Sequence, residues 1–281
     1  GVMRAEEGLE GDGVTDADLA IRVAVTIAGE EITVDFAGTD PAGPGNCNCP
    51  LAVTRSAVYF VIRALTDPDI PASAGAFAPV RVLAPRGSLV HAEPPSAVAG
   101  GNVETSSRIV DAVFRAFGEV VPAPAQGQGT MNNLTLGGRG FSYYETIGGG
   151  QGASPGADGP SAVHVAMSNT LNTPVEALET VYPLRVTRYR LRRGSGGAGR
   201  HRGGDGVVRG VEVLAETEAS VMAERRRSRP RGAEGGADGA PGRTLLNGEP
   251  LPGKWRGRLR PGDVIEIESP GGGGHGRPEP T

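Results

Sequence analysis

Glycine is the feature of this sequence that most limits what the chain can fold into. The 46 glycines and 23 prolines together make up about a quarter of the 281 residues. Because glycine weakens helices and strands and proline interrupts both, this composition favours a loop-rich chain. This composition approaches that of disordered chains. The net charge of only −4 and several periodic apolar segments argue instead for a folded protein.

The periodic segments predict an α+β fold that is rich in strands. Residues 21–27 and 31–36 alternate apolar and polar residues around a short turn, which predicts a β-hairpin. Pro50 precedes an apolar segment that predicts a helix over 51–65. A second helix is expected over 105–117, and a capping-box pattern at 173–176 predicts a short helix ending near residue 180. Further strands are expected at 134–136, 141–144, 184–191, 207–214, 219–223 and 264–268, with a turn at 246–249.

These elements predict a β-rich mixed fold with a few short helices and long Gly-rich loops. We divide it into an α+β region, residues 1–181, and a region of mostly antiparallel β-structure, residues 182–281. The two regions form either separate domains or one continuous domain.

Composition also excludes several classes of protein. The longest apolar stretch, residues 57–65, is too short to cross a membrane and contains Arg63. No secretory leader is recognised at the start of the sequence. Two cysteines, Cys47 and Cys49, cannot hold together a secreted fold and are expected to be buried or semi-exposed structural thiols. We therefore expect a cytoplasmic protein that has no membrane segment.

Thirteen arginines lie between Arg185 and Arg231. Such a cluster can bind nucleic acid. The chain is acidic overall, however, and aromatic residues for base stacking make up only 4%. A solvated face or a face between subunits is favoured over a nucleic-acid interface.

Several short motifs match known functional patterns, but the residues around them lack what those functions require. Two glycine patterns, at 194–199 and 271–276, match the dinucleotide-binding spacing but are not followed by a helix, so tight loops between strands are expected. Ser154 stands in a G-x-S-x-G pattern, but Pro155 has no N–H for an oxyanion hole. Lys254 is the only lysine and lacks the hydroxyl residue that follows a P-loop lysine. The four histidines and two cysteines show no metal-ligand spacing, so we expect no metal site here.

Four segments concentrate amides, hydroxyls and carboxylates beside glycines: 100–106, 128–133, 144–150 and 164–176. Glycine lets the backbone approach a ligand closely, so such segments suit a binding site. The same residue types also build turns and helix caps. Composition alone favours the second interpretation.

The same segments, with 194–206 and 270–276, resemble the hydantoinase B/oxoprolinase family in consistent order over nearly the whole chain. This family includes the B subunits of ATP-dependent hydantoin and N-methylhydantoin amidohydrolases, the C-terminal part of 5-oxoprolinases, and subunits of acetone and acetophenone carboxylases. The resemblance implies a partner, the A-type subunit, that binds ATP and Mg²⁺ and phosphorylates the substrate carbonyl oxygen. It implies no cofactor bound by this chain.

Two features depart from the family pattern. The chain corresponds to the C-terminal half of a B subunit, so the resemblance implies a separate N-terminal half as a partner, with a possible divalent metal there. In addition, Ala166 stands where the family's His-x-His block, which begins here at His164, has its second histidine.

The resemblance implies a hydrolase that acts on a phosphorylated lactam such as hydantoin, N-methylhydantoin or 5-oxoproline. The expected acid/base or water-positioning residues are Glu104, Glu145 and His164. The expected polar contacts to substrate are Asn102, Gln128, Asn132, Asn133, Asn169, Asn172 and Thr173. Two alternatives stay open: a non-catalytic assembly module of such a complex, and a subunit of a ketone carboxylase.

Overall fold

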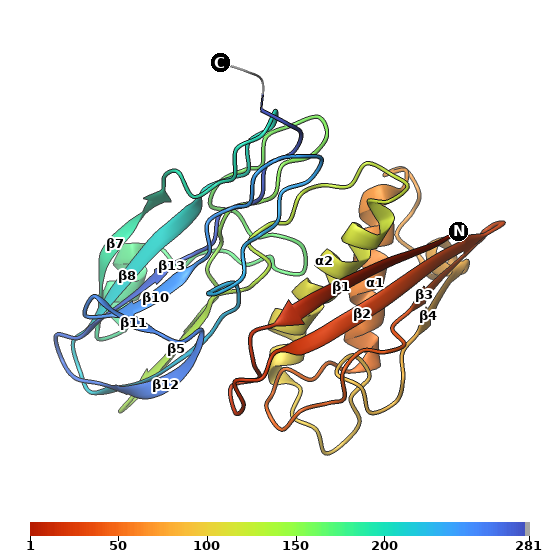
Figure 1. Cartoon of the computed structure of the whole chain (residues 1–281). Coiled ribbons are helices and arrows are strands. Elements are labelled where there is room, and N and C mark those ends of the chain that lie inside the picture. Colours follow the sequence, from red (N-terminus) through yellow and green to blue (C-terminus); the bar gives the residue numbers. More distant parts are fainter. Residues whose placement is uncertain (279–281) are drawn as a thin grey trace. The chain divides into compact units, whose positions relative to one another are not determined.

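The structure, a computed structural model, describes residues 1–278 (Figure 1). The chain forms two compact units, Gly1–Ala123 and the residues from Pro124 onward. Strands outnumber helices and most strand pairs are antiparallel, which confirms the α+β prediction. The division made from the sequence, between residues 181 and 182, lies within the second unit.

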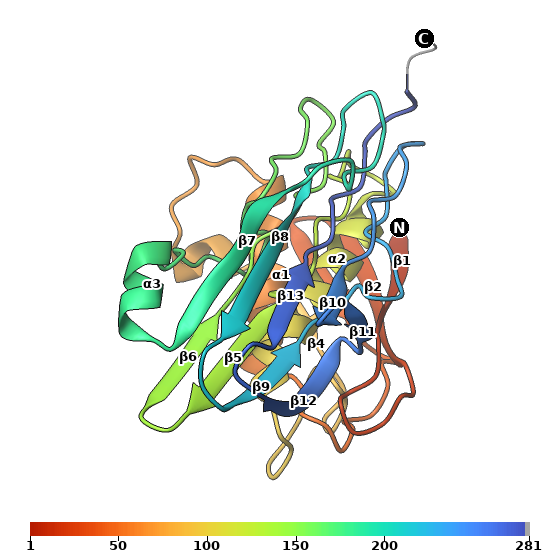
Figure 2. The ribbon, with the colours of Figure 1, turned by 90° about the vertical axis from the view of Figure 1, so that its left-hand side faces the viewer.

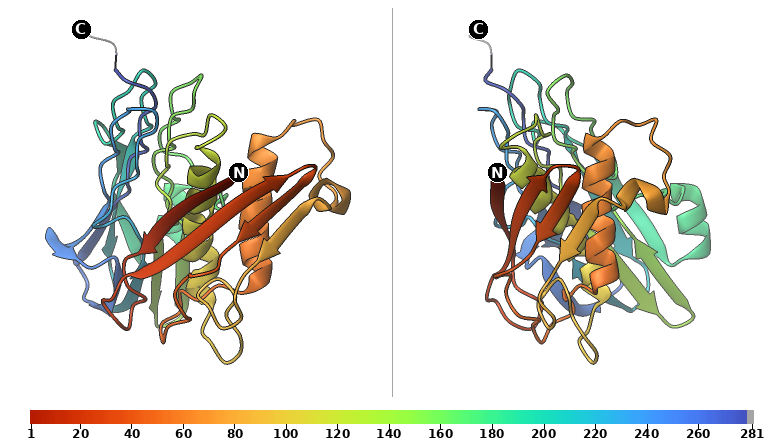
Figure 3. Two further views of the ribbon diagram at one scale, coloured as in Figure 1. Left: turned by 45° about the vertical axis from the view of Figure 1, so that its right-hand side comes forward. Right: turned by 90° about the vertical axis from the view of Figure 1, so that its right-hand side faces the viewer.

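The first unit is a four-stranded sheet with two helices packed on it. Its elements are β1 (Val2–Leu9), β2 (Leu19–Ala28), β3 (Glu31–Asp35), α1 (Leu51–Leu65), a 3₁₀ turn (Ala74–Phe77), β4 (Val80–Leu83), a π-helical turn (Gly101–Thr105) and α2 (Ser106–Phe117). The strands follow the order β1-β2-β3-β4, with only β3 and β4 parallel. Helix α2 packs against β1 and β2, and α1 packs against α2 (Figure 3). The predicted hairpin and both predicted helices are therefore confirmed.

The segment around the two cysteines is tied to the start of α2. Neither thiol forms a disulfide, and both are fully buried. The side-chain amide of Asn48 donates hydrogen bonds to the carbonyl oxygens of Gly43 (3.0 Å), Gly45 (2.9 Å) and Ala97 (2.9 Å). The Thr105 hydroxyl donates to the Cys47 carbonyl oxygen. The burial of both thiols and these hydrogen bonds show that the cysteines are part of the packed structure of the first unit.

We expect neither thiol to react with iodoacetamide in the native protein at about pH 8. Both sulfurs are buried, so the reagent does not reach them, and burial raises the pKa of Cys49 to about 11, so almost no Cys49 thiolate is present. Intact-mass measurement after alkylation should show two added groups only when denaturant is present. Labelling of the native protein would contradict the buried environment.

The second unit contains two sheets that enclose an apolar core (Figure 2). The four-stranded sheet has the order β12-β9-β5-β6, and the five-stranded sheet has the order β11-β10-β13-β8-β7. The elements are β5 (Asn133–Gly138), β6 (Phe141–Glu145), α3 (Val175–Val181), β7 (Leu184–Arg192), β8 (Gly206–Val213), β9 (Thr217–Met222), β10 (Arg243–Leu246), β11 (Glu249–Leu251), β12 (Lys254–Leu259) and β13 (Val264–Glu268). Leu134 and Leu136 from one sheet and Val211 and Ile267 from the other are core residues.

Helix α3 begins at the predicted place but without the predicted capping box. Pro174 occupies the N-cap position and makes no side-chain capping hydrogen bond. Thr173, the expected cap, instead places its side chain beside Tyr143. The short helix is therefore confirmed, whereas the capping interaction predicted for it is wrong.

Beyond the sheets, the second unit holds a bundle of extended segments that we call the glycine bundle: residues 125–128, 150–153, 195–206, 231–240 and 270–276. Figure 1 shows these segments as plain tubes running side by side near the C-terminus. The N–H groups of Gly272, Gly273 and Gly274 donate to the carbonyl oxygens of Gly204 (2.9 Å), Gln126 (2.8 Å) and Ala237 (2.9 Å). Three consecutive residues thus bind three different segments, as in an extended helix that repeats every three residues.

Glycine is required in this bundle because neighbouring backbones approach on several sides. A Cβ atom added to Gly272 would lie well under 3.0 Å from the Gln151 carbonyl group, and one added to Gly204 would meet Pro160 in the same way. The tight-loop prediction holds for Gly194, which has a φ of +81° in a turn. It is wrong for residues 271–275, which run extended through the bundle.

Candidate functional site

One group of polar residues lies where the two sheets of the second unit end. Strand β6 is the last strand of the four-stranded sheet, and β7 is the last strand of the five-stranded sheet. Between them lies a set of residues that we call the edge cluster: Tyr143, Glu145, Asn172, Thr173, Tyr189 and Arg209. Arg209 lies on β8 and pairs in register with Tyr189 on β7. Val207 and Val211, two residues before and after Arg209 in β8, belong to the core. Residues two apart in a strand share a face, so the Arg209 side chain lies on the inner face of the sheet.

The centre of the edge cluster is a buried ion pair. Arg209 Nε donates to Glu145 Oε2 at 3.3 Å, and Arg209 Nη2 lies 3.2 Å from Glu145 Oε1. The side chains of Arg209 and Glu145 are only 1% and 6% exposed, so water screens this pair very little. The guanidinium carbon also lies 4.7 Å from the centre of the Tyr189 ring, which gives a cation–π contact.

Burial dominates the acid–base properties of the edge cluster. It raises the pKa of Glu145, although the positive charge of Arg209 acts in the opposite direction. Burial also raises the pKa of Tyr143 and of Tyr189. A carboxylate with a raised pKa is better suited to accept and return a proton near neutral pH than an exposed one. The cluster therefore has the chemistry of a general base beside a fixed positive charge.

The segment that leads into α3 contacts this cluster. The Asn172 side-chain amide donates to the Tyr189 hydroxyl, and Thr173 lies beside Tyr143. Leu171, immediately before them, is 94% exposed. Earlier in the same segment, His164 Nδ1 lies 2.6 Å from Ser168 Oγ, and partial burial lowers the pKa of His164. Asn169 is exposed.

A second polar group, the amide cluster, contains Gln128 and Asn132. The Asn132 side-chain amide donates to Gln128 Oε1 at 2.9 Å, and both amides reach the Ile147 carbonyl oxygen at 3.3 Å. Arg226 Nη1 donates to Asn132 Oδ1 at 2.9 Å. Gly149 must be glycine because a Cβ there would collide with Gln128 Oε1. The two predicted residues of this cluster, Gln128 and Asn132, are thus hydrogen-bonded to each other in the protein interior.

One further predicted residue, Asn133, and the single lysine, Lys254, also have defined contacts. Asn133 Oδ1 accepts a hydrogen bond of 2.6 Å from the Tyr144 hydroxyl. Lys254, the single lysine, forms an ion pair with Glu224, and the Glu224 side chain is fully buried. This pairing agrees with the conclusion that Lys254 does not serve a P-loop.

The remaining two predicted residues belong to the first unit. Glu104 lies in the π-helical turn before α2 and is fully buried, whereas Asn102 in the same turn is exposed. Ser106 Oγ donates to the Asn102 carbonyl oxygen at 2.5 Å. The structure thus brings Glu145, Asn172 and Thr173 together, and separately Gln128 and Asn132.

Arg209, Tyr143 and Tyr189 complete the edge cluster but were not predicted from the sequence. Arg209 was included among the thirteen arginines assigned to a surface. A usable signal did exist, because alternation along the predicted strand at 207–214 places residue 209 on the same face as Val207 and Val211. A charged residue on an apolar strand face needs a buried partner.

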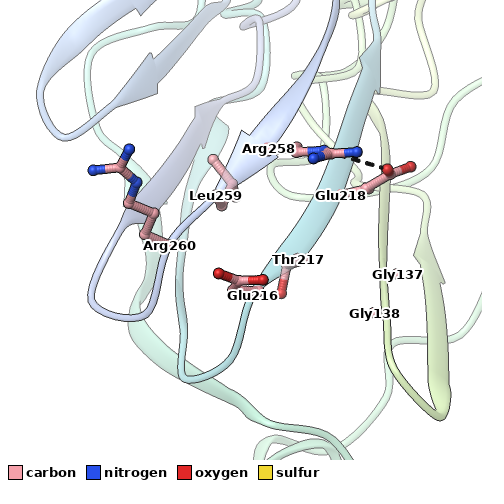
Figure 4. Close-up of a pocket in the computed structure, with 8 residues that line it drawn as sticks. All are labelled: Gly137, Gly138, Glu216, Thr217, Glu218, Arg258, Leu259 and Arg260. Atoms are coloured by element: carbon pink, nitrogen blue, oxygen red, sulfur yellow. Dashed lines mark ion pairs between the residues drawn. The ribbon is translucent and has the colours of Figure 1, made fainter.

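A depression of about 550 Å³ lies elsewhere on the second unit (Figure 4). Glu218 and Arg258 at its wall form an ion pair of 3.6 Å between well-exposed side chains. None of the predicted site residues lines it. Within residues 1–278, no group of three or more histidine, cysteine or acidic side chains is arranged to hold a metal ion. None of the helices described is long and apolar enough to span a membrane.

Comparisons with known proteins give consistent results. The profile of the family described as hydantoinase B/oxoprolinase matches residues 1–278. The chain is 42% identical to 5-oxoprolinase 1 of Arabidopsis thaliana, over 95% of this chain and 21% of that protein. The ATP-dependent caprolactamase from Pseudomonas jessenii superposes with a TM-score of 0.88 at 26% identity, covering 99% of this chain and 53% of the other.

The nucleotide-free structure of acetone carboxylase superposes with a TM-score of 0.81 at 18% identity, covering 98% of this chain and 45% of that one. At this identity the likeness shows a shared fold. The chain spans about half the length of these two solved structures and about a fifth of the plant protein.

Proposed function

Because the chain belongs to the hydantoinase B/oxoprolinase family, we propose that it forms part of an ATP-dependent enzyme that opens a cyclic amide. Substrates of this class are hydantoin, N-methylhydantoin and 5-oxoproline. The relatives whose names state an activity on a lactam, a 5-oxoprolinase and a caprolactamase, support this substrate class. The proposed partners are an ATP-binding A-type subunit, which would also hold Mg²⁺, and the N-terminal half of a B subunit.

The observation that carries this proposal is the buried Glu145–Arg209 pair in the edge cluster. Phosphorylation of the lactam oxygen removes the amide resonance and makes the ring carbon accessible to water. Glu145 would accept a proton from that water and return it to the ring nitrogen as the C–N bond breaks, which gives an acyl phosphate and a free amine. A second water would then hydrolyse the acyl phosphate to a carboxylate and inorganic phosphate. Arg209 would stabilise the negative charge of the phosphoryl oxygens carried by the substrate, and Asn172 would orient the substrate.

Access of a substrate to this pair would require the segment at residues 169–173 to move. Glu145 and Arg209 are buried, and Asn172 in this segment is hydrogen-bonded to the Tyr189 hydroxyl of the same cluster. A shift of residues 169–173 would expose the carboxylate while α3 stays in place. Substrate entry would then be coupled to this exposed segment, as is common for covering loops in enzymes.

We expect Glu145→Gln to reduce lactam ring opening about 100-fold or more in the enzyme assembled with its ATP-binding partner, because the variant cannot accept a proton. Ring-opened product and ADP should be measured together. Phosphorylation by the partner does not use this carboxylate, so ADP release should fall less than ring opening. The folded fraction can be checked by the fluorescence of Trp255.

The matched control is Glu176→Gln on α3, which removes an exposed carboxylate and should leave turnover unchanged. Full ring-opening activity of Glu145→Gln would refute the proposed base. The same assay applied to Glu104→Gln and His164→Gln tests the other two proposed acid/base residues. If no site variant affects turnover but omission of the chain abolishes it, the chain is an assembly module.

A further inference from the structure

The arginines of β7 form part of a charged row across the outer face of the five-stranded sheet. In register, Arg190 on β7 lies opposite Val208 on β8, Val208 opposite Glu268 on β13, and Glu268 opposite Arg243 on β10. Val208 does not belong to the core cluster between the sheets, although it is 2% exposed. The stems of the long side chains around it account for this burial.

This row forms the floor of a depression of about 430 Å³ that we call the arginine depression. Its lining is Arg190, Leu191, Arg192, Arg193, Val208, Arg243 and Glu268. The lining therefore contains four arginines and one carboxylate. Adjacent strands are spaced by about 4.8 Å, so arginine side chains from β7 and β10 are long enough to converge above Val208.

The single carboxylate is already fully used by two of the arginines. Arg243 donates from Nε to Glu268 Oε2 at 2.8 Å and from Nη2 to Glu268 Oε1 at 2.9 Å. Arg192 Nε lies 3.1 Å from Glu268 Oε2. Arg190 and Arg193 have no acidic partner among residues 1–278. The depression therefore has an excess of positive charge at its rim.

Arg192 is held in a fixed position by hydrogen bonds, which favours a site that is preorganised for a ligand. Arg192 Nη1 donates to the carbonyl oxygens of Pro241 (2.6 Å) and Ser269 (3.2 Å), and its side chain is 17% exposed. Burial lowers the pKa of Arg192; Glu268 opposes this effect and the like charge of Arg243 adds to it. An added anion would relieve this unfavourable arrangement of positive charges.

We propose that the arginine depression binds a tetrahedral phosphate-type oxyanion, either free or as the phosphate group of a small molecule. The planar guanidinium group presents paired N–H donors that match phosphate oxygens, and such charge-assisted hydrogen bonds are among the strongest in proteins. Arg190 and Arg193 supply the donors from the rim. The site is separate from the edge cluster, because Glu145 and Arg209 do not line it.

The test is a titration of the full chain with inorganic phosphate, in which sodium chloride keeps the ionic strength constant. Calorimetry and the thermal midpoint should both show saturable binding at one site. Arg190→Gln combined with Arg193→Gln should weaken binding about tenfold or more, since two charged hydrogen bonds are lost. Both side chains are exposed, so the double variant should fold.

The matched control is Arg256→Gln combined with Arg258→Gln on β12, which removes the same charge from exposed positions of the other sheet. It should bind phosphate as the wild type does. Equal weakening in both double variants, or binding that never saturates, would overturn the proposal. Competition by ADP would show that the site accepts the phosphate of a nucleotide, and absence of competition would exclude this nucleotide as the ligand.

Discussion

Replacement of Gly272 by alanine is expected to lower the free energy of unfolding of the second unit by about 3 kcal/mol or more, at or beyond the upper end of the usual cost of overpacking. The added Cβ would collide with the backbone of Gln151, which is itself held by hydrogen bonds to Pro160 and Gly204. No flexible side chain is available to move aside. Because small domains are stable by only about 5–15 kcal/mol, this single methyl group removes a large part of the total.

Guanidinium denaturation followed by Trp255 fluorescence measures this loss, since Trp255 is the single tryptophan and packs against the core of the second unit. The control is Gly156→Ala in the same unit, where an added Cβ meets no atom within 4 Å. Its midpoint should be close to that of the wild type. If both variants unfold at the same denaturant concentration, the close packing of the glycine bundle is refuted.

Replacement of Arg209 by methionine is expected to cost about 3–5 kcal/mol of stability, because it leaves the buried Glu145 carboxylate without its positive partner. The double variant Arg209→Met with Glu145→Leu should recover most of this loss, because buried ion pairs are often replaced by apolar residues at little cost. Denaturation of both single variants, the double variant and the wild type gives the coupling energy. A coupling near zero would show that the two side chains do not interact.

The deficit of Arg209→Met should also depend on pH. Burial already raises the pKa of Glu145 in the folded state, so folding favours its neutral form. That contribution is present at low pH and is lost as the pH rises through the folded-state pKa. Loss of Arg209 removes an interaction that lowers this pKa. The deficit should therefore shrink as the pH falls from about 7 to about 5, and a deficit that grows would contradict this account.

Prediction from sequence worked where side-chain periodicity carries the information. The hairpin at β2 and β3 alternates regularly, and α1 begins directly after Pro50, so both were found with nearly the observed bounds. Strand β1 was missed because Glu7 faces the buried side with Met3 and Leu9 and hides the alternation. In these segments, a single charged residue at a buried position is enough to hide the alternation by which a strand is predicted.

Part of the candidate site could also be predicted from a local sequence pattern. Polar segments rich in glycine drew attention to Glu145 and Asn172, which the structure brings to one place. Arg209 was hidden because many arginines surround it in sequence. The glycine bundle could not be predicted at all, since its order comes from lateral backbone hydrogen bonds that leave no side-chain pattern.

The glycine bundle also imposes an order of events during synthesis. Residues 272–274 form hydrogen bonds with segments as distant in sequence as Gln126, and the final segment fills the space between all the others. Contacts of such long sequence separation close slowly. On the ribosome, the earlier segments must wait, with their backbone donors and acceptors bound to water, until residues 270–276 emerge. The second unit therefore completes its fold only after nearly all of the chain described here has been translated.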